Sequence, residues 1–457
     1  EQRKRAFLFE NYLITLAIPQ TVPLDEFVER ILPGMAPERG ARVRQSLARE
    51  IAVLTAHLHD AGLVHQDFHP GNLLVRFDAD DRPHLSLIDL DALRSTRRLD
   101  WRVAMRNLAL LNHYFWLRCS RADRRRFLGE YLRSRKMNAT DARKFAPAIE
   151  DSTRRWAERL WTRWGRRCCG TNKYFKAFRQ DRAWAITSRE LDRDVAKRVL
   201  DDPIRPLDQS GVTVLKESRT TTVAEVTMSV RGRPTKVIYK RFKSKKPFEW
   251  LLNVFRPTRA WRAWQAAQHL VSRGIPTPKN LAIVERTARF IPIPLETFLI
   301  AVKAEGARSL SDYIADDLPR LAAKDQRRAI RSLTKALAIL LRSLHERSIS
   351  DRDLKAANIL IEGDPAVEEP RLSLIDLVGV QLRHPIPRHR RLQNLARLQV
   401  SLEAVTGRTR TDALRFLRSY LVWGLSPLND WKGLWRQVAR LCDRKRERNR
   451  NRGRLIS

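Results

Sequence analysis

The stretch Asp351-Arg352-Asp353-Leu354-Lys355-Ala356-Ala357-Asn358 decides how the rest of this 457-residue chain is interpreted. Apolar residues 359–361 follow it, and a second apolar run, 372–375, ends at Asp376. Both runs predict short buried strands that hold the polar loop still. Asp353 is spaced to accept a proton from an attacking hydroxyl, while Asn358 and Asp376 offer oxygen atoms of the kind that Mg²⁺ prefers. An Asp-x-x-x-x-Asn spacing alone is common in loops, but Lys355 and the flanking strands favour an acid–metal site.

The chain carries this pattern twice. Residues 63–74 hold Asp67 and Asn72 at the spacing of Asp353 and Asn358, and residues 85–90 repeat residues 372–377 letter for letter, so Asp89 is the counterpart of Asp376. Further matches continue at nearly the same offset, for example Asn107-Leu108-Ala109 with Asn394-Leu395-Ala396. Repeats of about 20 to 50 residues build solenoids, so a repeat of this length predicts a duplicated domain.

The net charge is strongly positive, +38, from 89 basic and 51 acidic residues. Such an excess predicts an anionic partner, which is a nucleic acid, an acidic membrane surface or a phosphorylated glycan. The arginines are spread along helical stretches and do not gather with aromatic residues in one recognition motif, so nucleic acid is the least favoured of the three. Residues 444–452 predict a frayed basic tail, with membrane contact as an equal alternative.

Composition favours a globular protein of the reducing cytoplasm. The hydrophobic content of 43% is ample for packed cores, and the length predicts two or three domains. We expect no transmembrane helix, because no apolar run reaches about 18 residues, and we find no signal-peptide pattern at the start. The four cysteines lack a paired metal spacing. Cys168 and Cys442 hold matching positions in the repeat, which favours a packing role.

The first half predicts a helical lobe without a separate β-sheet domain ahead of it. Residues 11–14 are expected to form a strand, and an amphipathic helix over 42–60, ended by Gly62, leads to the first polar loop. Residues 101–200 are rich in Arg and Trp with helical periodicity, so we expect them to complete the lobe and form a connector. A domain boundary is predicted at residues 201–206, which contain two prolines.

Beyond that boundary the pattern changes to the alternation of β-strands. Three strands are predicted, at residues 212–217, 224–230 and 235–242. Lys240 lies in the third, where a lone lysine is as often an edge residue as a functional one. A helix is expected at 260–272. In protein kinases, which Val237-Ile238-Tyr239-Lys240 resembles in its third strand, the helix after that strand carries a Glu that pairs with the lysine, and this helix contains no Glu. Lys240 therefore has Glu225, Glu249 or Asp376 as its candidate acidic partner, or this copy is impaired.

The polar loop and Asp376 resemble the protein-kinase catalytic loop and its metal-binding Asp, with Asp351 in place of the usual His. More closely, the chain resembles the bacterial lipopolysaccharide kinase family, the Kdo and heptose kinases. The features that carry this resemblance lie within residues 212–400: Val237-Ile238-Tyr239-Lys240, Gly274-Ile275-Pro276-Thr277-Pro278, the Asp353 loop and Leu374-Ile375-Asp376-Leu377. The first half resembles only the catalytic lobe, and its His69-Pro70-Gly71-Asn72 is also similar to aminoglycoside-type phosphotransferases.

The resemblance implies an α+β, protein-kinase-like fold. It consists of a small antiparallel β N-lobe and a helical C-lobe, with a second kinase-like C-lobe ahead of them. The expected domains are residues 1–200, a first C-lobe that lacks its N-lobe, with a helical connector; residues 201–302, the N-lobe of the second copy; and residues 303–457, its C-lobe with the basic tail.

The resemblance also implies ATP- and Mg²⁺-dependent phosphorylation of a sugar hydroxyl in lipopolysaccharide core or a related glycolipid, on the inner face of the cytoplasmic membrane. Asp353 would orient and deprotonate the hydroxyl, Lys355 and Lys240 would balance phosphate charge, and Asn358 and Asp376 would hold nucleotide and metal. Asp67, Asn72 and Asp89 would play the same parts in a first copy that we expect to be less active. A protein Ser/Thr kinase and an inactive scaffold stay as alternatives. The aromatic residues 245–256 favour packing on their own domain over a lipid interface.

Overall fold

A computed structural model describes residues 14–97, 99–138, 141–180, 183–243, 256–287, 294–403, 405, 407–421 and 431–451. The chain divides into two compact units, residues 1–160 and 161–457. This division comes before the boundary predicted at residues 201–206, because residues 161–200 pack with the second unit. Nearly all of the strand predicted at 11–14 and of the aromatic segment 245–256 lies outside the described residues.

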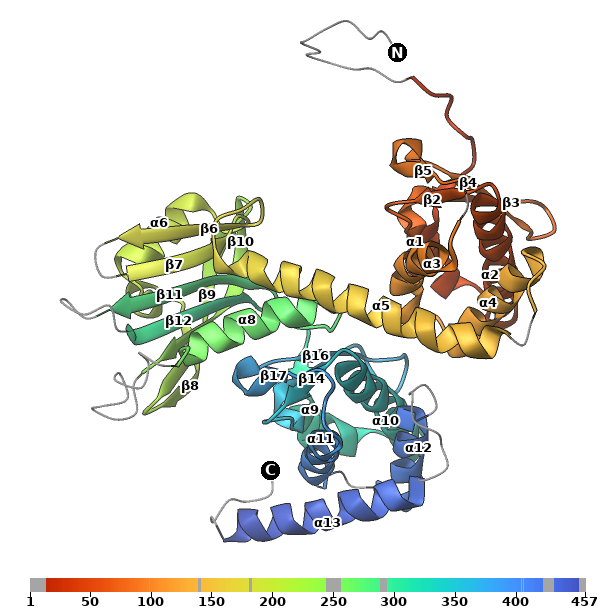
Figure 1. The fold of residues 1–457 in the computed structure, drawn as a ribbon. Helices are drawn as coiled ribbons and strands as arrows, with labels where there is room; N and C mark the ends of the chain where they lie inside the picture. The colour runs from red at the N-terminus through yellow and green to blue at the C-terminus, as the bar shows by residue number, and fades with distance from the viewer. Residues whose placement is uncertain are drawn as a thin grey trace, which may run out of the picture. The chain divides into compact units, whose positions relative to one another are not determined.

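The first unit is a helical lobe with two small sheets (Figure 1). Its strands are β1 (Val22–Pro23), β2 (Leu63–His65), β3 (Leu73–Phe77), β4 (Pro83–Leu87) and β5 (Leu93–Ser95). They pair in the orders β1-β3-β4 and β2-β5. Its helices are α1 (Leu24–Glu26), α2 (Pro37–Asp60), α3 (Trp101–Trp116), α4 (Arg121–Ser134) and α5 (Asp141–Gly165), whose last turn belongs to the second unit.

Helix α2 leads to the first polar loop, as predicted. It begins at Pro37, whose fixed φ suits a first helical turn, and it buries Val43, Leu47 and Ile51 along one face. Gly62 follows the helix at a φ of 70°, and a Cβ there would lie 2.4 Å from the carbonyl oxygen of Thr96. Glycine is therefore required for the chain to turn from α2 into β2.

A seven-stranded antiparallel sheet forms the first part of the second unit. Its order is β6 (Phe175–Gln180), β7 (Ala183–Ser188), β11 (Asn280–Thr287), β12 (Pro294–Val302), β10 (Arg233–Phe242), β9 (Thr221–Val230) and β8 (Thr213–Ser218). The three predicted strands are confirmed as β8, β9 and β10. The prediction of a helical connector was wrong for β6 and β7, because Ala185 and Ile186 are buried where β7 pairs with β11.

Helices cover both faces of this sheet, and Figure 1 shows α6 (Arg193–Asp201) and α8 (Arg259–Ser272) on opposite sides. Val199 of α6 packs in one core with Tyr239 of β10, whereas Trp264 of α8 packs in another with Phe242, also of β10. Side chains alternate between the two faces of a strand. Lys240 therefore lies on the α8 face, together with Phe242.

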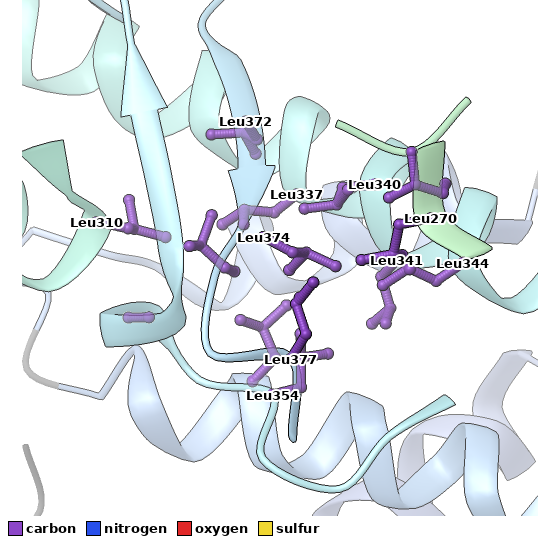
Figure 2. Close-up of a cluster of buried hydrophobic side chains, with 14 of the residues drawn as sticks. Leu270, Leu310, Leu337, Leu340, Leu341, Leu344, Leu354, Leu372, Leu374 and Leu377 are labelled. Atoms are coloured by element: carbon purple, nitrogen blue, oxygen red, sulfur yellow. The ribbon is translucent and has the colours of Figure 1, made fainter. Parts of the chain in front are cut away.

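The helical part of the second unit continues the same core. Its helices are α9 (Leu310–Asp312), α10 (Ala323–Glu346), α11 (Arg388–Ser401), α12 (Arg410–Leu421) and α13 (Trp431–Arg450). Its strands are β13 (Arg308–Ser309), β14 (Ile349–Asp351), β15 (Ile359–Glu362), β16 (Arg371–Leu374) and β17 (Val380–Leu382). Figure 2 shows Leu270 of α8 beside Leu341 and Leu344 of α10, all fully buried. The Leu374 N–H donates to the Pro276 carbonyl at 3.0 Å. Sheet and helices are thus held together beneath Lys240.

The two units contain the same succession of elements around their polar loops. Helices α2 and α10 each have 24 residues, and each follows a π-helical turn, Phe27–Ile31 or Tyr313–Asp317. A short strand, the polar loop and a pair of antiparallel strands come next in both units. This order matches the repeat found in the sequence.

The prediction of a frayed basic tail was wrong, whereas burial confirms the packing role expected for Cys168 and Cys442. Residues 444–450 continue helix α13 and are not a frayed tail. Cys442 of that helix is buried and donates to the Ala396 carbonyl of α11 at 3.8 Å. Cys168 is also buried, but it lies in the turn after α5, where its carbonyl accepts from Trp264 Nε1 at 2.8 Å. The two cysteines therefore pack in different surroundings.

Candidate active site

The polar loop of the second unit is fixed mainly by Asn358. This residue ends a 3-10 turn (Ala356–Asn358) that leads into β15, and its side chain is buried. Its Nδ2 donates to the Asp353 carbonyl at 2.8 Å and to Asp353 Oδ2 at 3.3 Å. Its own carbonyl accepts from Ile375 N at 2.9 Å. The spacing of five residues thus closes the loop and joins it to the strand that leads to Asp376.

Asp376 follows β16 in the left-handed backbone region, at a φ of 55°. Its carboxylate is exposed, and no hydrogen bond from the described residues reaches it or Asn358 Oδ1. The Asp376 carboxylate and Asn358 Oδ1 could therefore both ligate a hard cation that takes most of its ligands from phosphate and water. In the described part of the chain, no three His, Cys, Asp or Glu side chains gather as a fuller metal site.

Lys240, on the sheet, lies near enough to Asp376 for the two charges to interact. Burial lowers the pKa of this half-buried lysine, the Asp376 charge raises it, and the charge of Lys216 on β8 lowers it. Among the described residues, no carboxylate forms an ion pair with the Lys240 ammonium. A desolvated ammonium without a close counterion favours an anion in the adjacent space.

The three candidate partners of Lys240 have separate outcomes. Glu225 is wrong as a partner, because it pairs with Lys303 at 2.6 Å and Lys236 at 3.1 Å. Glu249 lies outside the described residues. Asp376 supplies the attractive charge, because its carboxylate raises the Lys240 pKa against the larger lowering by burial.

Helix α8 offers no acid to Lys240. Its N-terminal cap is Thr258, whose Oγ1 accepts from Trp261 N at 3.1 Å and donates to Glu285 of β11 at 2.6 Å. Burial raises the pKa of Glu285, and the Thr258 hydrogen bond lowers it. Glu285 is therefore engaged by the cap of the helix rather than by a lysine.

Asp353 lies at the mouth of the loop. Its side chain is 56% exposed, and its Oδ2 lies 3.7 Å from Lys355 Nζ. The Asp353 N–H donates to Asp351 Oδ1 at 2.9 Å. The carboxylate is thus accessible to a solute and is oriented from below by Asp351, Asn358 and Lys355.

Asp351 is buried, unlike Asp353. Burial raises the pKa of Asp351 to about 6, aided by the negative charges of Asp353 and Asp376 and opposed by the Asp353 N–H and the Arg397 charge. A Cβ on Gly379 would lie 2.5 Å from Asp351 Oδ1. A side chain at position 379 would therefore force Asp351 to shift, although the backbone φ at this glycine is ordinary.

The turn between β8 and β9 does not offer its amides to a phosphate. Residues 218–222, Ser-Arg-Thr-Thr-Thr, form this turn and contain no glycine, so their hydroxyl and N–H groups are the donors that a phosphate could use there. Instead, Ser218 Oγ accepts from Thr221 N at 3.1 Å and from Thr220 N at 3.4 Å. The serine satisfies its own turn.

The sequence analysis missed a group of arginines beside the loop. Burial lowers the pKa of Arg262 on α8, and so do the positive charges of Arg352, Arg259 and Arg256. Arg262 Nε is buried without a hydrogen-bond partner among the described residues. Arg256, Arg259 and Arg262 recur at every third residue, which is a signal in the sequence, but only the fold adds Arg352 next to Asp353. The group is a strongly positive surface at the mouth of the loop.

The first unit keeps the loop but surrounds it with different charges. Asn72 Nδ2 donates to the Asp67 carbonyl at 2.9 Å, as Asn358 does to Asp353. Asp67 Oδ2 lies 3.5 Å from His69 Nε2. A hydrogen bond from Asp91 raises the pKa of Asp89, and the Asp91 charge adds to this shift. Asp67, Asn72 and Asp89 therefore lie at one loop, without a lysine in the place of Lys240 in the described part of this unit.

Solved structures similar to the chain include the three that follow, each with a TM-score under 0.5. Among solved structures, WaaP in complex with acyl carrier protein is 24% identical to the chain with a TM-score of 0.41, covering 56% of this chain and 97% of that one. The kinase domain of BubR1 is 12% identical, with a TM-score of 0.33 and coverage of 60% and 86%. The ROP18 kinase domain with AMP-PNP and sucrose is 16% identical, with a TM-score of 0.32 and coverage of 55% and 83%. No curated protein matches.

The family comparison covers both units. The second unit, with its antiparallel sheet and helical lobe around one core, has a protein-kinase-like α+β fold. The model of the lipopolysaccharide kinase (Kdo/WaaP) family matches residues 1–131 and 208–420, which is more than half of the chain. The chain therefore belongs to the lipopolysaccharide kinase (Kdo/WaaP) family.

Proposed function

We propose that the chain is an ATP- and Mg²⁺-dependent phosphotransferase whose acceptor is a sugar hydroxyl of lipopolysaccharide core or a related anionic glycolipid, and that the second unit does the chemistry. One observation carries the proposal. Lys240, an ammonium without an ion-pair partner among the described residues, lies near enough to Asp376 to feel its charge, while Asn358 donates a hydrogen bond to the Asp353 carbonyl in the same unit. This set supplies a base, a metal site and a phosphate ligand together.

Asp353 is the base in this proposal. Its exposed carboxylate accepts the proton of the sugar hydroxyl as the hydroxyl oxygen bonds to the terminal phosphorus of ATP, while the bond from that phosphorus to the bridging oxygen breaks and ADP leaves. The Asn358 Nδ2 contact at 3.3 Å and the Asp351 contact to its N–H restrict its orientation. Proximity and orientation account for most of the catalysis, because phosphoryl transfer needs little covalent help from the protein.

The metal and the phosphates are held by the remaining residues. Mg²⁺ bound by Asn358 Oδ1 and Asp376 would neutralise charge on the terminal phosphates. Lys240 binds phosphate oxygens from the sheet, which returns a counterion to its desolvated ammonium. Lys355, next to Asp353, balances the charge that develops on the transferred group.

The positive surface beside the loop supports an anionic acceptor. Arg262 and Arg352 lie close enough for each charge to act on the other, although like charges repel. Such a group is stable when it binds an anion, and guanidinium groups bind phosphate with paired hydrogen bonds. A glycolipid that already carries phosphate is such an anion. The net charge of +38 also favours an anionic acceptor.

The proposal is tested by following labelled phosphate from ATP with Mg²⁺, the full chain and lipid-linked core sugars. We expect the label in the glycolipid. The variant Lys240→Met should transfer about 10²–10³-fold less, the cost of losing one electrostatic stabiliser. Lys236→Met is the matched control, because Lys236 lies on the same strand but pairs with Glu225 at 3.1 Å; it should retain activity.

Two other outcomes would replace the proposal. Label in protein instead of glycolipid would identify a protein kinase. An inactive scaffold is favoured by one observation, the absence of any acid on α8 to pair with Lys240. If Mg–ATP neither raises the melting temperature of the full chain nor is consumed, the scaffold is correct and the phosphotransferase proposal fails.

We also infer peripheral contact with an anionic membrane. No helix in the described ranges combines the length and apolar character needed to cross a bilayer. Helix α13 exposes Trp435 beside Arg436, with Arg440 and Arg444 one and two turns further on. Tryptophan and arginine on one helix face suit an anionic lipid surface. Sedimentation with phosphatidylglycerol vesicles should occur at low salt and be lost when Arg440 and Arg444 are both changed to Gln.

A further inference from the structure

A hollow of about 890 Å³ lies in the second unit, away from Lys240 and the polar loop. It is bounded by the end of α5, the β6–β7 hairpin and the C-terminal half of α8, and all of its lining residues fall within residues 164–280. Ligand sites in proteins measure roughly 300–1,000 Å³. The size therefore suits a small organic ligand, and none of the residues discussed for phosphoryl transfer lines it.

The floor of the hollow is rigid and aromatic. Trp264, almost fully buried, donates its Nε1–H to the Cys168 carbonyl at 2.8 Å. Phe175 contacts the same indole edge to face, with ring centroids 5.6 Å apart. The turn above it is fixed by Asn172, whose Oδ1 accepts from Tyr174 N at 2.9 Å. The hollow is thus already formed without a ligand.

The rim carries more positive charge than its one acid can balance. Five cations line the hollow, Arg167, Lys173, Arg189, Arg231 and Lys279, against the single carboxylate of Glu190. Glu190 pairs with Lys279 at 2.5 Å and also with Arg231. Arg167, Lys173 and Arg189 are left without an acid in the lining. These three cations favour an anionic ligand.

Aromatic rings hold two of these cations in place. The Arg167 guanidinium lies 5.6 Å from the Trp164 ring centre and 5.1 Å from that of Tyr174. Lys173 Nζ lies 5.0 Å from the Tyr174 ring centre. A hydrogen bond from Lys173 lowers the pKa of Tyr174, and the Arg167 charge lowers it further. The cations are therefore positioned in advance, with their remaining N–H groups available for phosphate.

Neutral donors and ring faces indicate that the ligand is more than a phosphate ion. Asn280 lines the hollow, and its Nδ2 is buried without a hydrogen-bond partner among the described residues. Such a donor costs free energy unless a ligand satisfies it. Trp164 and Tyr174 present apolar surface beside the cations, which suits the C–H face of a sugar ring.

We propose that this hollow binds a phosphorylated sugar, with the phosphate at Arg167, Lys173 and Arg189 and the hydroxyl groups toward Asn280. The ligand is either a free sugar phosphate or the phosphorylated sugar headgroup of a glycolipid. The inference does not depend on phosphotransferase activity, because no residue of the polar loop lines the hollow.

The test is calorimetric titration of the full chain with glucose 6-phosphate, in the presence of excess Mg²⁺ and AMP-PNP to occupy a nucleotide site. We expect saturable binding, with glucose and inorganic phosphate each at least about tenfold weaker, since each lacks one half of the contacts. Lipid A in detergent micelles distinguishes the two sources. Stronger binding of lipid A indicates a headgroup site, whereas binding of glucose 6-phosphate alone indicates a free sugar phosphate.

The variants locate the site. Lys173→Gln and Arg167→Gln should each weaken glucose 6-phosphate about tenfold, the loss expected for one charge-assisted hydrogen bond. Lys176→Gln is the matched control, because Lys176 lies on β6 with its Nζ 5.0 Å from the Phe178 ring but does not line the hollow. Lys173 is exposed, so its variant should fold. Unchanged affinity in both variants, equal binding of AMP, or no binding by the wild type would overturn the proposal.

Discussion

The two polar loops of the molecule are supported by the same buried hydrogen bonds. In the first unit, His59 Nδ1 lies 2.7 Å from Tyr131 Oη and its Nε2 lies 3.1 Å from Asn107 Oδ1. In the second, His345 has the same distances to Tyr420 and Asn394. Each asparagine also donates to the backbone carbonyl just before the loop, of His65 or Asp351. This support consists of hydrogen bonds between neutral side chains and backbone carbonyls. It therefore does not depend on which charged residues the loop contains.

The residues around the start of the polar loop differ between the two units at three matching positions. The first unit has His65, whose Nε2 lies 3.1 Å from the Asp89 carbonyl oxygen, and the repeat aligns it with Asp351. Near Asp351, the second unit has Gly379, which leaves room for its carboxyl, and Arg397, whose charge partly balances it. The repeat gives Ala92 and Leu110 at those positions. A carboxyl in place of the imidazole thus comes with extra space and an added cation.

The strand-end aspartates also differ. Asp376 acts on a lysine from the sheet, whereas Asp89 is next to Asp91, whose hydrogen bond raises the Asp89 pKa. A second acid in that position disfavours the charged form of Asp89. The comparison shows that the two units share the loop hydrogen bonds, whereas the charges around their strand-end aspartates differ.

The largest effect we predict separates the two loops by activity. Asp353→Ala should lower phosphoryl transfer by about 10²–10⁴-fold, because a general base is lost, whereas Asp67→Ala should leave the rate unchanged. Both aspartates are exposed, so neither variant should unfold its unit. Initial rates of labelled glycolipid formation measure both. An equal loss in the two variants would mean that the first unit takes part in catalysis.

The next effect tests the coupled set around Asp351. Gly379→Ala would bring a Cβ to 2.5 Å from Asp351 Oδ1 and 3.0 Å from Asp353 N. We expect a loss of about 1–3 kcal/mol in the stability of the second unit, typical of overpacking, together with slower transfer because Asp353 is displaced. Urea titration followed by hydrogen exchange of β14 and β17 peptides measures the stability.

The first unit supplies the control for that variant. Exchanging the whole set, with Asp351→His, Gly379→Ala and Arg397→Leu together, copies the arrangement of the first unit. We expect the triple variant to be more stable than Gly379→Ala alone, because the imidazole replaces the carboxyl that the new methyl group would meet. A triple variant that is no more stable than the single one would show that the set is not coupled.

Spacing in the sequence was sufficient for the loop but not for its surroundings. Asp353 and Asn358 are five residues apart, and the loop that joins them is local, so the pattern alone placed both residues in one loop between two short strands. The Arg262–Arg352 proximity and the role of Gly379 at Asp351 connect residues far apart in the chain, which periodicity does not detect. The β6–β7 hairpin was missed for a related reason. Its short alternation, Ala183 to Ser188, is buried only because β11, about a hundred residues later, pairs with it.

The smallest effect we predict compares the supporting histidines by pH. Burial lowers the pKa of His59 to about 4 and that of His345 to about 3, in each case against an asparagine hydrogen bond that raises it. Both are therefore neutral when folded and take up a proton only on unfolding below about pH 6.5. Their contribution to stability is present above that pH and is lost as the pH falls toward these values. Each of these two histidines should lower the free energy of unfolding of its unit by about 1 kcal/mol for each pH unit below about 6.5.

The opposing group in the second unit is Asp351, and it makes the comparison sharper. Its pKa is raised to about 6, so its contribution runs the other way, being present at low pH and lost as the pH rises toward 6. Between pH 6.5 and 5 the first unit should therefore lose stability more steeply than the second, as measured by hydrogen exchange in urea.

The variant His59→Gln should flatten the pH dependence of stability in the first unit, whereas His57→Gln, at an exposed residue on the same helix, should not. Asp351→Asn should make the second unit as pH-sensitive as the first, and a slope that does not change would assign the acid sensitivity to other groups.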